Sequence, residues 1–350
     1  MGPDMSPNRT RYRTGDPQID ERLTELLDAL DVHENRDQLM EILTSVALLA
    51  DDETDRLNLK ITNSAVKEMR LAFKVFQPFK EVPKVTMFGS ARTLPEDPLY
   101  AQARNLASAL AAEGWMVVTG AGPGIMAAGV EGAGPDRSIG INIRLPFEQE
   151  PSPLLATDPK LVDMKYFFTR KLMLMKESAG FAVLPGGFGT LDEAFELLTL
   201  LQTGKAAPAP VVLLDVPGGT YWQSWDRFVR DELATRGLID PDDHNFYLIT
   251  DNVEAASAEI RGFYRNFHSI RYVGDTLVIR LQHAPTPAQL ERLNEEFADI
   301  SIKGRIEATD PLPAEVSGDD RLDLERVKLA FDKHHHGRLR QLIDALNALD

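Results

Sequence analysis

The sequence contains no cysteine among its 350 residues. This absence excludes disulfides, zinc–thiolate sites, iron–sulfur ligation and thiol nucleophiles. No stretch reaches the roughly 18 consecutive apolar residues of a membrane-spanning helix, and no pattern of a secretory signal peptide opens the sequence. We therefore expect a cytoplasmic protein without a membrane partner.

Positive charge is also scarce. The 38 Lys and Arg residues face 54 Asp and Glu residues, the net charge is −16, and no long basic stripe is present. Proteins that bind nucleic acids neutralise phosphates with clustered Lys and Arg, so we expect no nucleic-acid partner. A small phosphorylated ligand is compatible with this charge, because backbone amides and one or two arginines are enough to bind it.

Two common nucleotide-binding motifs are missing as well. The spacing Gly120-x-Gly122-x-Gly124 departs from the dinucleotide fingerprint G-x-G-x-x-G, because Ile125 takes the place of the third glycine. No G-x-x-x-x-G-K-[ST] motif occurs in the chain. The sequence therefore predicts neither a dinucleotide cofactor nor a P-loop, and we expect no cofactor and no metal.

The hydrophobic pattern divides the chain into three regions. Residues 1–83 have helical spacing of apolar residues, whereas from Lys84 short apolar runs alternate with helical segments. Strands without a polar face, each followed by a helix, are typical of a parallel sheet covered on both faces. We predict a Rossmann-like, doubly wound α/β domain over residues 84–269, after an N-terminal helical extension.

The remaining residues, 270–350, predict a small α+β domain of order β-α-β-β-α, with a regulatory or assembly role. The run His334-His335-His336 lies within it. Adjacent side chains point in different directions on a helix or strand, so this run predicts the solvated start of a helix rather than a metal site.

Three turns in the predicted α/β domain carry glycine, and each follows an apolar run. They are "MFGSAR" (Met87–Arg92), "TGAGPGIM" (Thr119–Met126) and "PGGFGT" (Pro185–Thr190). The carboxyl ends of parallel strands lie on one edge of the sheet, where ligands bind. Glycines there let backbone N–H groups approach an anion, and the following helix adds its positive end. The sequence predicts a nucleotide or sugar-phosphate site at this edge.

The segment Thr190-Leu191-Asp192-Glu193 permits two interpretations. It matches a capping box, in which Thr190 caps the helix and Glu193 binds back to the cap amide. Alternatively, Glu193 is a functional carboxylate beside the anion site. Asp192 and Glu193 do not form a catalytic pair with each other, since neighbouring helix positions diverge by about 100°.

The segment "YFFTRKLMLMKE" (Tyr166–Glu177) offers a counter-charge. Arg170 and Lys171 fall in the first turns of a predicted helix, where cations oppose the helix dipole. Either they form a solvated charge pair above an ordinary apolar core, or they face an anion or a carboxylate.

Together these segments resemble the Lonely Guy (LOG) family, and in particular its larger bacterial members. The signature P-G-G-x-G-T-x-x-E of that family matches Pro185–Glu193, and its Arg-Lys pair matches Arg170-Lys171. The segments "GAGPGIM", "IGINIRLPFEQ" (Ile139–Gln149) and "LLTLLQTGK" are similar too. Plant-type members carry Met-His before the Arg-Lys pair, whereas this chain has Phe167-Phe168-Thr169, which predicts a different base pocket.

The resemblance implies a nucleoside 5′-monophosphate phosphoribohydrolase, which cuts the base–ribose bond of AMP-like substrates, cytokinin riboside monophosphates or related nucleotides. It implies Glu193 and Arg170 as catalytic residues. The substrate-binding residues that it implies are Gly89, Ser90, Gly122, Gly124, Lys171, Gly186, Gly187, Phe188, Gly189 and Thr190. The family formerly carried the label lysine decarboxylase, but no lysine here has the context of a pyridoxal Schiff base.

Two further expectations accompany this resemblance. It implies a homo-oligomer, at least a dimer, and the apolar "KLMLMKE" helix beside the site favours the same conclusion. The alternative function is a non-hydrolytic protein of the same fold that binds or senses a nucleotide or cofactor. The intact Arg170 and Glu193 favour the enzyme.

Overall fold

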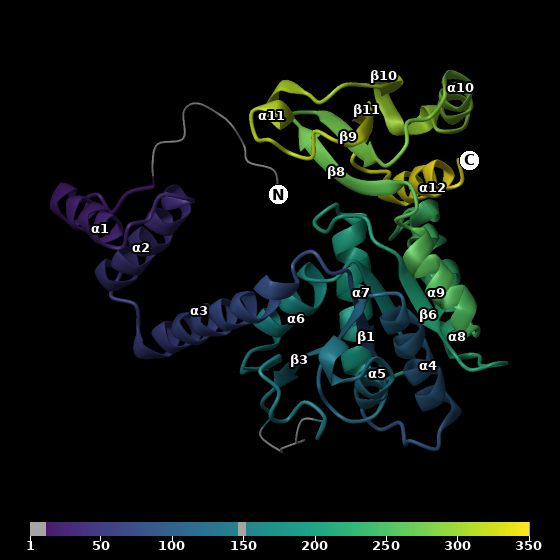
Figure 1. The fold of residues 1–350 in the computed structure, drawn as a ribbon, viewed down its shortest axis with the longest axis horizontal. Coiled ribbons are helices and arrows are strands. Elements are labelled where there is room, and N and C mark those ends of the chain that lie inside the picture. The colour runs from purple at the N-terminus through teal and green to yellow at the C-terminus, as the bar shows by residue number, and fades with distance from the viewer. Residues whose placement is uncertain (1–11, 146–151, 350) are drawn as a thin grey trace. The chain divides into compact units, whose positions relative to one another are not determined.

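The computed structural model in Figure 1 describes residues 12–145 and 152–349. Residues Pro146–Gln149 of the segment compared with the larger bacterial LOG members lie outside the described residues. Contacts group the chain into two compact units that meet between Lys67 and Glu68. The predicted boundaries after residues 83 and 269 stay a prediction.

The N-terminal unit is helical, as predicted. It contains α1 (Pro17–Ala29), α2 (Arg36–Asp51) and the first half of α3 (Arg56–Phe76). The carboxylate of Asp16 caps α1, since it accepts hydrogen bonds from the Gln18 and Ile19 amides at 2.8 Å and 3.4 Å.

A seven-stranded sheet forms the centre of the second unit, and every neighbouring pair of its strands is parallel. The spatial order is β4-β3-β2-β1-β5-β6-β7. The strands are β1 (Lys84–Phe88), β2 (Met116–Thr119), β3 (Ser138–Ile143), β4 (Leu161–Met164), β5 (Gly180–Val183), β6 (Val211–Leu214) and β7 (Tyr247–Thr250). This arrangement confirms the predicted doubly wound α/β fold.

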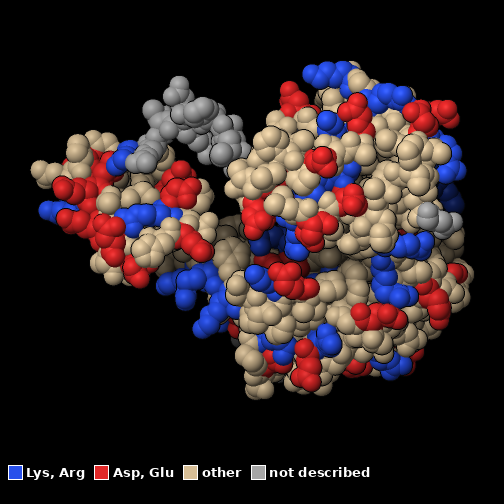
Figure 2. Space-filling model, turned by 45° about the horizontal axis from the view of Figure 1, so that its top comes forward, with Lys and Arg blue, Asp and Glu red and all other residues tan. Residues whose placement is uncertain are grey.

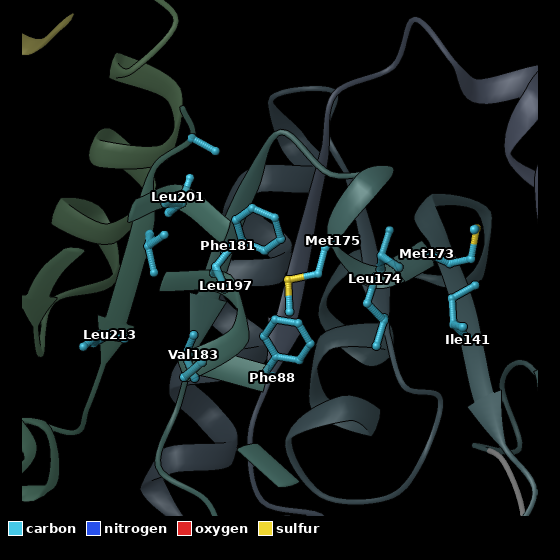
Figure 3. Close-up of a cluster of buried hydrophobic side chains, with 14 of the residues drawn as sticks. Phe88, Ile141, Met173, Leu174, Met175, Phe181, Val183, Leu197, Leu201 and Leu213 are labelled. Atoms are coloured by element: carbon cyan, nitrogen blue, oxygen red, sulfur yellow. The ribbon is translucent and has the colours of Figure 1, made fainter. Parts of the chain in front are cut away.

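Helices cover both faces of this sheet, as Figure 1 shows. The helices are α4 (Pro98–Ala112), α5 (Ile125–Ala133), α6 (Phe167–Lys176), α7 (Phe188–Gln202), α8 (Tyr221–Phe228) and α9 (Val253–Gly262). One core forms between the sheet and α4, α5 and α9. The other forms between the opposite face and α6, α7, α8 and the end of α3; Figure 3 shows part of it, with Phe88, Met175 and Phe181 in contact.

Burial on both faces explains why the central strands read as continuous apolar runs. Every residue of β1, β2, β5 and β6 is buried. The edge strand β7 was not predicted, because "YLIT" is short and all four of its residues are only half-buried. An edge strand of four residues is too short to show a clear alternation of apolar and polar residues.

The C-terminal part of the same unit is an antiparallel sheet of order β10-β11-β9-β8, packed with helices α10, α11 and α12. The elements are β8 (Phe267–Val273), β9 (Thr276–Leu281), α10 (Pro287–Glu296), β10 (Ser301–Ala308), α11 (Pro313–Val316), β11 (Glu325–Phe331) and α12 (His336–Asn347). This confirms the small α+β domain.

Two details of that domain correct the sequence prediction. The segment predicted as its first strand is a hairpin, because Gly274 has a φ of +59° and Val273 pairs with Thr276 across a two-residue turn. The histidine run does begin a helix, and His334 is exposed, but His335 at the N-cap is half-buried and His336 is only 7% exposed, so the predicted solvated start holds for part of the run.

Surface charge is mixed on the face shown in Figure 2, where Lys and Arg side chains are interspersed with Asp and Glu. No helix in the described part of the chain combines the length and apolar character needed to cross a membrane.

Candidate functional site

The strand order reverses direction between β1 and β5. From β1 the chain proceeds outward through β2 and β3 to β4, and it then returns to place β5 on the other side of β1. Doubly wound sheets bind ligands at this reversal, outside the carboxyl ends of the two strands. The chain leaves β1 through Gly89-Ser90 and β5 through Pro185–Gly187, so two of the three glycine turns meet there.

A cavity of about 850 Å³ opens at this point. Ten of the twelve predicted site residues line it, together with Gly120, Met126 and parts of β3 and α6. The ten are Gly89, Ser90, Gly122, Arg170, Gly186, Gly187, Phe188, Gly189, Thr190 and Glu193. Their roles stay predictions, but the structure brings these ten together.

The glycine turn after β5 presents free backbone amides to this cavity. Gly187 is the N-cap of α7, and its carbonyl accepts the first helical hydrogen bond, from Leu191 at 3.1 Å. Within the described chain, no group accepts a hydrogen bond from the amides of residues 187–190. These are the four N–H groups that every helix start leaves without an intrahelical partner. They form an anion-binding end with a positive dipole.

Glycine is required at two positions of these turns. A Cβ atom on Gly186 would lie 2.1 Å from the Thr190 Oγ1, and a Cβ atom on Gly89 would lie 2.6 Å from the Ile125 side chain. The turn after β5 therefore packs against α7, and the turn after β1 packs against α5, without side chains between.

The capping-box interpretation of Thr190 and Glu193 is wrong. The helix begins at Phe188, three residues earlier than that box requires, so Thr190 is its third residue and not its cap. The Glu193 side chain faces the cavity instead of the helix end. Its Oε2 atom is buried and has no hydrogen-bond partner among the described residues.

Burial dominates the electrostatics of Glu193, of which only 6% is exposed. Loss of hydration raises the pKa of this carboxyl to about 7, against the opposing charges of Lys171 and Arg170. A perturbed carboxyl in a cavity is a common property of functional sites.

Arg170 lies close enough to influence Glu193 but is held by backbone carbonyls. Its Nε donates to the carbonyl of Ile141 at 2.9 Å, and its Nη2 donates to that of Gly120 at 3.2 Å. Burial lowers the pKa of Arg170, while the charge of Glu193 acts in the opposite direction. A Cβ atom on Gly120 would lie 1.9 Å from Nη2, so this glycine makes room for the guanidinium.

The other two predicted residues do not line the cavity, and their substrate contacts stay predictions. Lys171 pairs with Asp192 at 2.7 Å and with Glu196 at 2.6 Å, both on α7. Burial opposes the charge of Lys171, but these two hydrogen bonds outweigh it and raise its pKa. Gly124 has a φ of +68°, and a Cβ atom there would lie 2.2 Å from the Ser90 carbonyl oxygen, so it lets the second turn pack under the first.

Sequence reasoning missed three further residues that line the cavity, Arg92, Asn142 and Phe167. Asn142 is 8% exposed, and its Nδ2 donates to Asp163 at 2.9 Å. Because a carboxylate only accepts hydrogen bonds, this contact turns the Asn142 oxygen away from Asp163. The available signal was an asparagine near the carboxyl end of the mostly apolar strand "SIGINI".

Part of the chain is similar to known proteins. Residues 123–260 match the family model described as "Possible lysine decarboxylase". The cytokinin riboside 5′-monophosphate phosphoribohydrolase LOG1 of Arabidopsis thaliana is 42% identical over 72 residues, and LOG7 of the same plant is 31% identical over 101 residues. In this segment the chain is similar to the LOG family. The matched segments cover 21% and 29% of this chain, and 32% and 45% of those two relatives.

Two solved structures also align with this chain. They are the molybdenum cofactor binding protein of Rippkaea orientalis (TM-score 0.35) and the molybdenum cofactor carrier protein of Chlamydomonas reinhardtii (TM-score 0.36). Each is 22% identical to this chain, and each alignment covers 51% of this chain and 96% of the other.

Proposed function

We propose that the chain hydrolyses the N-glycosidic bond of nucleoside 5′-monophosphates to a free base and ribose 5-phosphate. The observation that supports this proposal most is the buried, unpartnered carboxylate of Glu193, in the same cavity as the free amides at the start of α7. An anion-binding helix end and a carboxylate match the two ends of a ribose phosphate, its 5′-phosphate and its anomeric carbon.

In this proposal the 5′-phosphate binds to the amides of Gly187, Phe188, Gly189 and Thr190, with Gly89 and Ser90 in the neighbouring turn beside them. A helix start with free amides binds a phosphate without any lysine nearby. This explains how a chain of net charge −16 holds an anion.

Glu193 supplies the negative charge that the reaction needs. When the base departs, positive charge develops on the anomeric carbon and the ring oxygen, and a carboxylate in a water-poor site stabilises it. Water then attacks the anomeric carbon; its oxygen stays on the sugar, and the departing base nitrogen gains a proton. Arg170 offsets the repulsion between Glu193 and the phosphate, and no cofactor takes part.

The decarboxylase label of the family model has no support from the lysine beside this site. Lys171 is paired with two carboxylates, and its pKa is raised. A lysine that forms a Schiff base needs the opposite environment, one that favours the neutral amine.

The same proposal includes a homo-oligomer, at least a dimer, with α6 and α7 in the interface. Apolar side chains on these helices are exposed, including Phe168 at 54%, Leu172 at 44% and Phe195 at 38%. We expect light scattering at micromolar protein to give at least twice the monomer mass, and a monomer mass would contradict this part.

The test of the activity is release of free base. We expect the purified chain to release base and equimolar ribose 5-phosphate from at least one member of a panel containing AMP, GMP, IMP, CMP, UMP and a cytokinin riboside 5′-monophosphate. Arg170→Ala should lose this turnover, whereas Arg261→Ala, which removes an exposed partner of Glu113, should keep it. Binding of a nucleotide without base release would favour the non-hydrolytic alternative. If the chain neither binds a nucleotide nor releases base, both the enzyme and the alternative are contradicted.

A further inference from the structure

The loop that carries the free amides is held from behind by Tyr221, a residue outside the cavity lining. The Tyr221 hydroxyl donates to the carbonyl oxygen of Gly186 at 2.6 Å. Burial raises the pKa of this phenol, so it stays protonated and remains a donor. This hydrogen bond also fixes the direction of the Gly187 N–H, which belongs to the same peptide unit as the Gly186 carbonyl.

The peptide unit between Gly186 and Gly187 is planar and trans, so its C=O and its N–H point in opposite directions. Fixing the Gly186 carbonyl toward Tyr221 therefore fixes the Gly187 N–H away from it. Gly187 is the N-cap of α7, and its amide is the first of the four free N–H groups. A Cβ atom on Gly187 would meet nothing within 4 Å, so side-chain packing does not hold the Gly187 end of this peptide.

The neighbouring carbonyls of this loop are fixed too, but by backbone groups. The Pro185 carbonyl accepts from the Ser90 amide at 3.2 Å, and the Gly187 carbonyl accepts from the Leu191 amide at 3.1 Å. The carbonyls of Pro185 and Gly187 thus accept from backbone amides, whereas the Gly186 carbonyl between them accepts from a side chain. The side chain at position 221 thus controls one peptide of the loop.

Tyr221 is itself held firmly at the start of α8. Its backbone amide donates to the Asp215 carboxylate at 3.1 Å, and its ring makes an edge contact with Trp222 at a centroid distance of 4.8 Å. Trp222 is fully buried, and its Nε1 donates to the Leu214 carbonyl at 3.3 Å. These contacts anchor the Tyr221 ring to the carboxyl end of β6.

We infer that Tyr221 is a positioning residue that aims the Gly187 amide at the phosphate of the substrate. This inference rests on the proposed function, because it assigns the helix end to the 5′-phosphate. It predicts that loss of the hydroxyl weakens recognition of the phosphate and leaves the chemistry at the sugar unchanged.

The test is Tyr221→Phe in the full chain, with Tyr264→Phe as the matched control. Tyr264 also donates to a backbone carbonyl, that of Ala179 at 2.7 Å, but Ala179 precedes β5 and lies at the strand end away from the cavity. We expect Tyr221→Phe to raise the KM for AMP about fivefold to tenfold, as the loss of one hydrogen bond predicts, with kcat within about twofold. The Kd for ribose 5-phosphate, measured by calorimetry, should rise by the same factor, and Tyr264→Phe should change neither constant.

A purely structural role would change the melting temperature without changing the preference for a phosphate. The preference for AMP over adenosine should therefore fall in Tyr221→Phe and stay constant in Tyr264→Phe. An unchanged preference, or equal losses in both variants, overturns the inference while base release by the wild type still supports the proposed function. If the wild type releases no base, the proposed function fails, and the ribose 5-phosphate titration of both variants still decides the inference.

Discussion

The α/β domain and the C-terminal domain each bury a glutamate, and the two residues differ in almost every other respect. Glu193 in the cavity is 6% exposed, and its Oε2 has no partner among the described residues. Glu315 on α11 is fully buried, and it accepts hydrogen bonds from Arg280 Nη2 at 2.7 Å and from the Leu312 amide at 3.1 Å. The Nε atom of Arg326 lies 3.3 Å from Oε2 of Glu315.

Their pKa values shift in opposite directions for that reason. Burial alone raises the pKa of a carboxyl, and at Glu193 burial prevails and brings the pKa to about 7. At Glu315 burial acts in the same direction, but the hydrogen bonds from Arg280 and Leu312 and the charge of Arg326 outweigh it and lower the pKa. A paired buried carboxylate joins parts of a domain, whereas an unpaired one in a cavity is available to a ligand.

The largest expected effect separates the two glutamates by activity. Glu193→Gln keeps the size of the side chain but removes its charge, and we expect base release to fall by a factor of about 100 or more. Glu315→Gln should leave kcat/KM within about twofold at a temperature where both variants are folded. Base released from AMP over time is the measurement, and normal turnover by Glu193→Gln would remove the main support for the enzyme.

The second expected effect separates them by stability. Glu315→Gln leaves the buried guanidinium of Arg326 and part of that of Arg280 uncompensated, so the free energy of unfolding should fall by about 3 kcal/mol. Urea unfolding at pH 7 measures it. A loss below about 1 kcal/mol would show that the cluster around Glu315 does not stabilise the domain as its burial indicates.

The third expected effect is the pH dependence of stability, which has opposite signs at the two positions. The folded pKa of Glu193 is raised, so its protonated form contributes stability that is fully present below the unfolded pKa of about 4.5 and is lost as pH rises through about 7. Glu193→Gln should therefore be more stable than the wild type by about 2 kcal/mol at pH 8 and equal to it near pH 4.5.

The folded pKa of Glu315 is lowered, so its contribution is present above about pH 4.5 and is lost as pH falls through the lower folded pKa. Melting curves of both Gln variants from pH 4 to pH 8 test the comparison. An advantage of Glu193→Gln that does not change with pH would mean that Glu193 is not titrating in this range.

The smallest expected effect is a change in the pH dependence of kcat/KM when a charge near Glu193 is removed. The kcat/KM for AMP should fall below about pH 7 as Glu193 takes up a proton in the free enzyme. Because the charge of Lys171 lowers the pKa of Glu193, Lys171→Met should move this fall to higher pH. Lys176→Met, on the same helix but paired with Glu177, is the control and should leave the profile unchanged. A profile that does not move in Lys171→Met would contradict the coupling.

Much of the fold was predictable from the sequence, because local patterns carry it. Strands β1 to β6 are fully or mostly apolar runs, each followed within two residues by glycine, proline or a charged residue, and such runs predict buried parallel strands. The hairpin was missed although Gly274-Asp275, between two apolar runs, is a signal for a two-residue turn. The capping box places the start of α7 three residues too late, and that difference alone kept the box open as an interpretation.

By itself, the sequence determined that three glycine turns lie at the carboxyl edge of a parallel sheet, and that Glu193 follows one of them. Only the tertiary structure decided what the carboxylate faces. Asp192 and Glu196 are four residues apart and share one side of α7, so a single lysine from α6 neutralises both. Glu193 lies about 100° around the helix from Asp192, and that turn places it in the cavity, with its charge unpaired because the packing of α6 against α7 brings no donor to it.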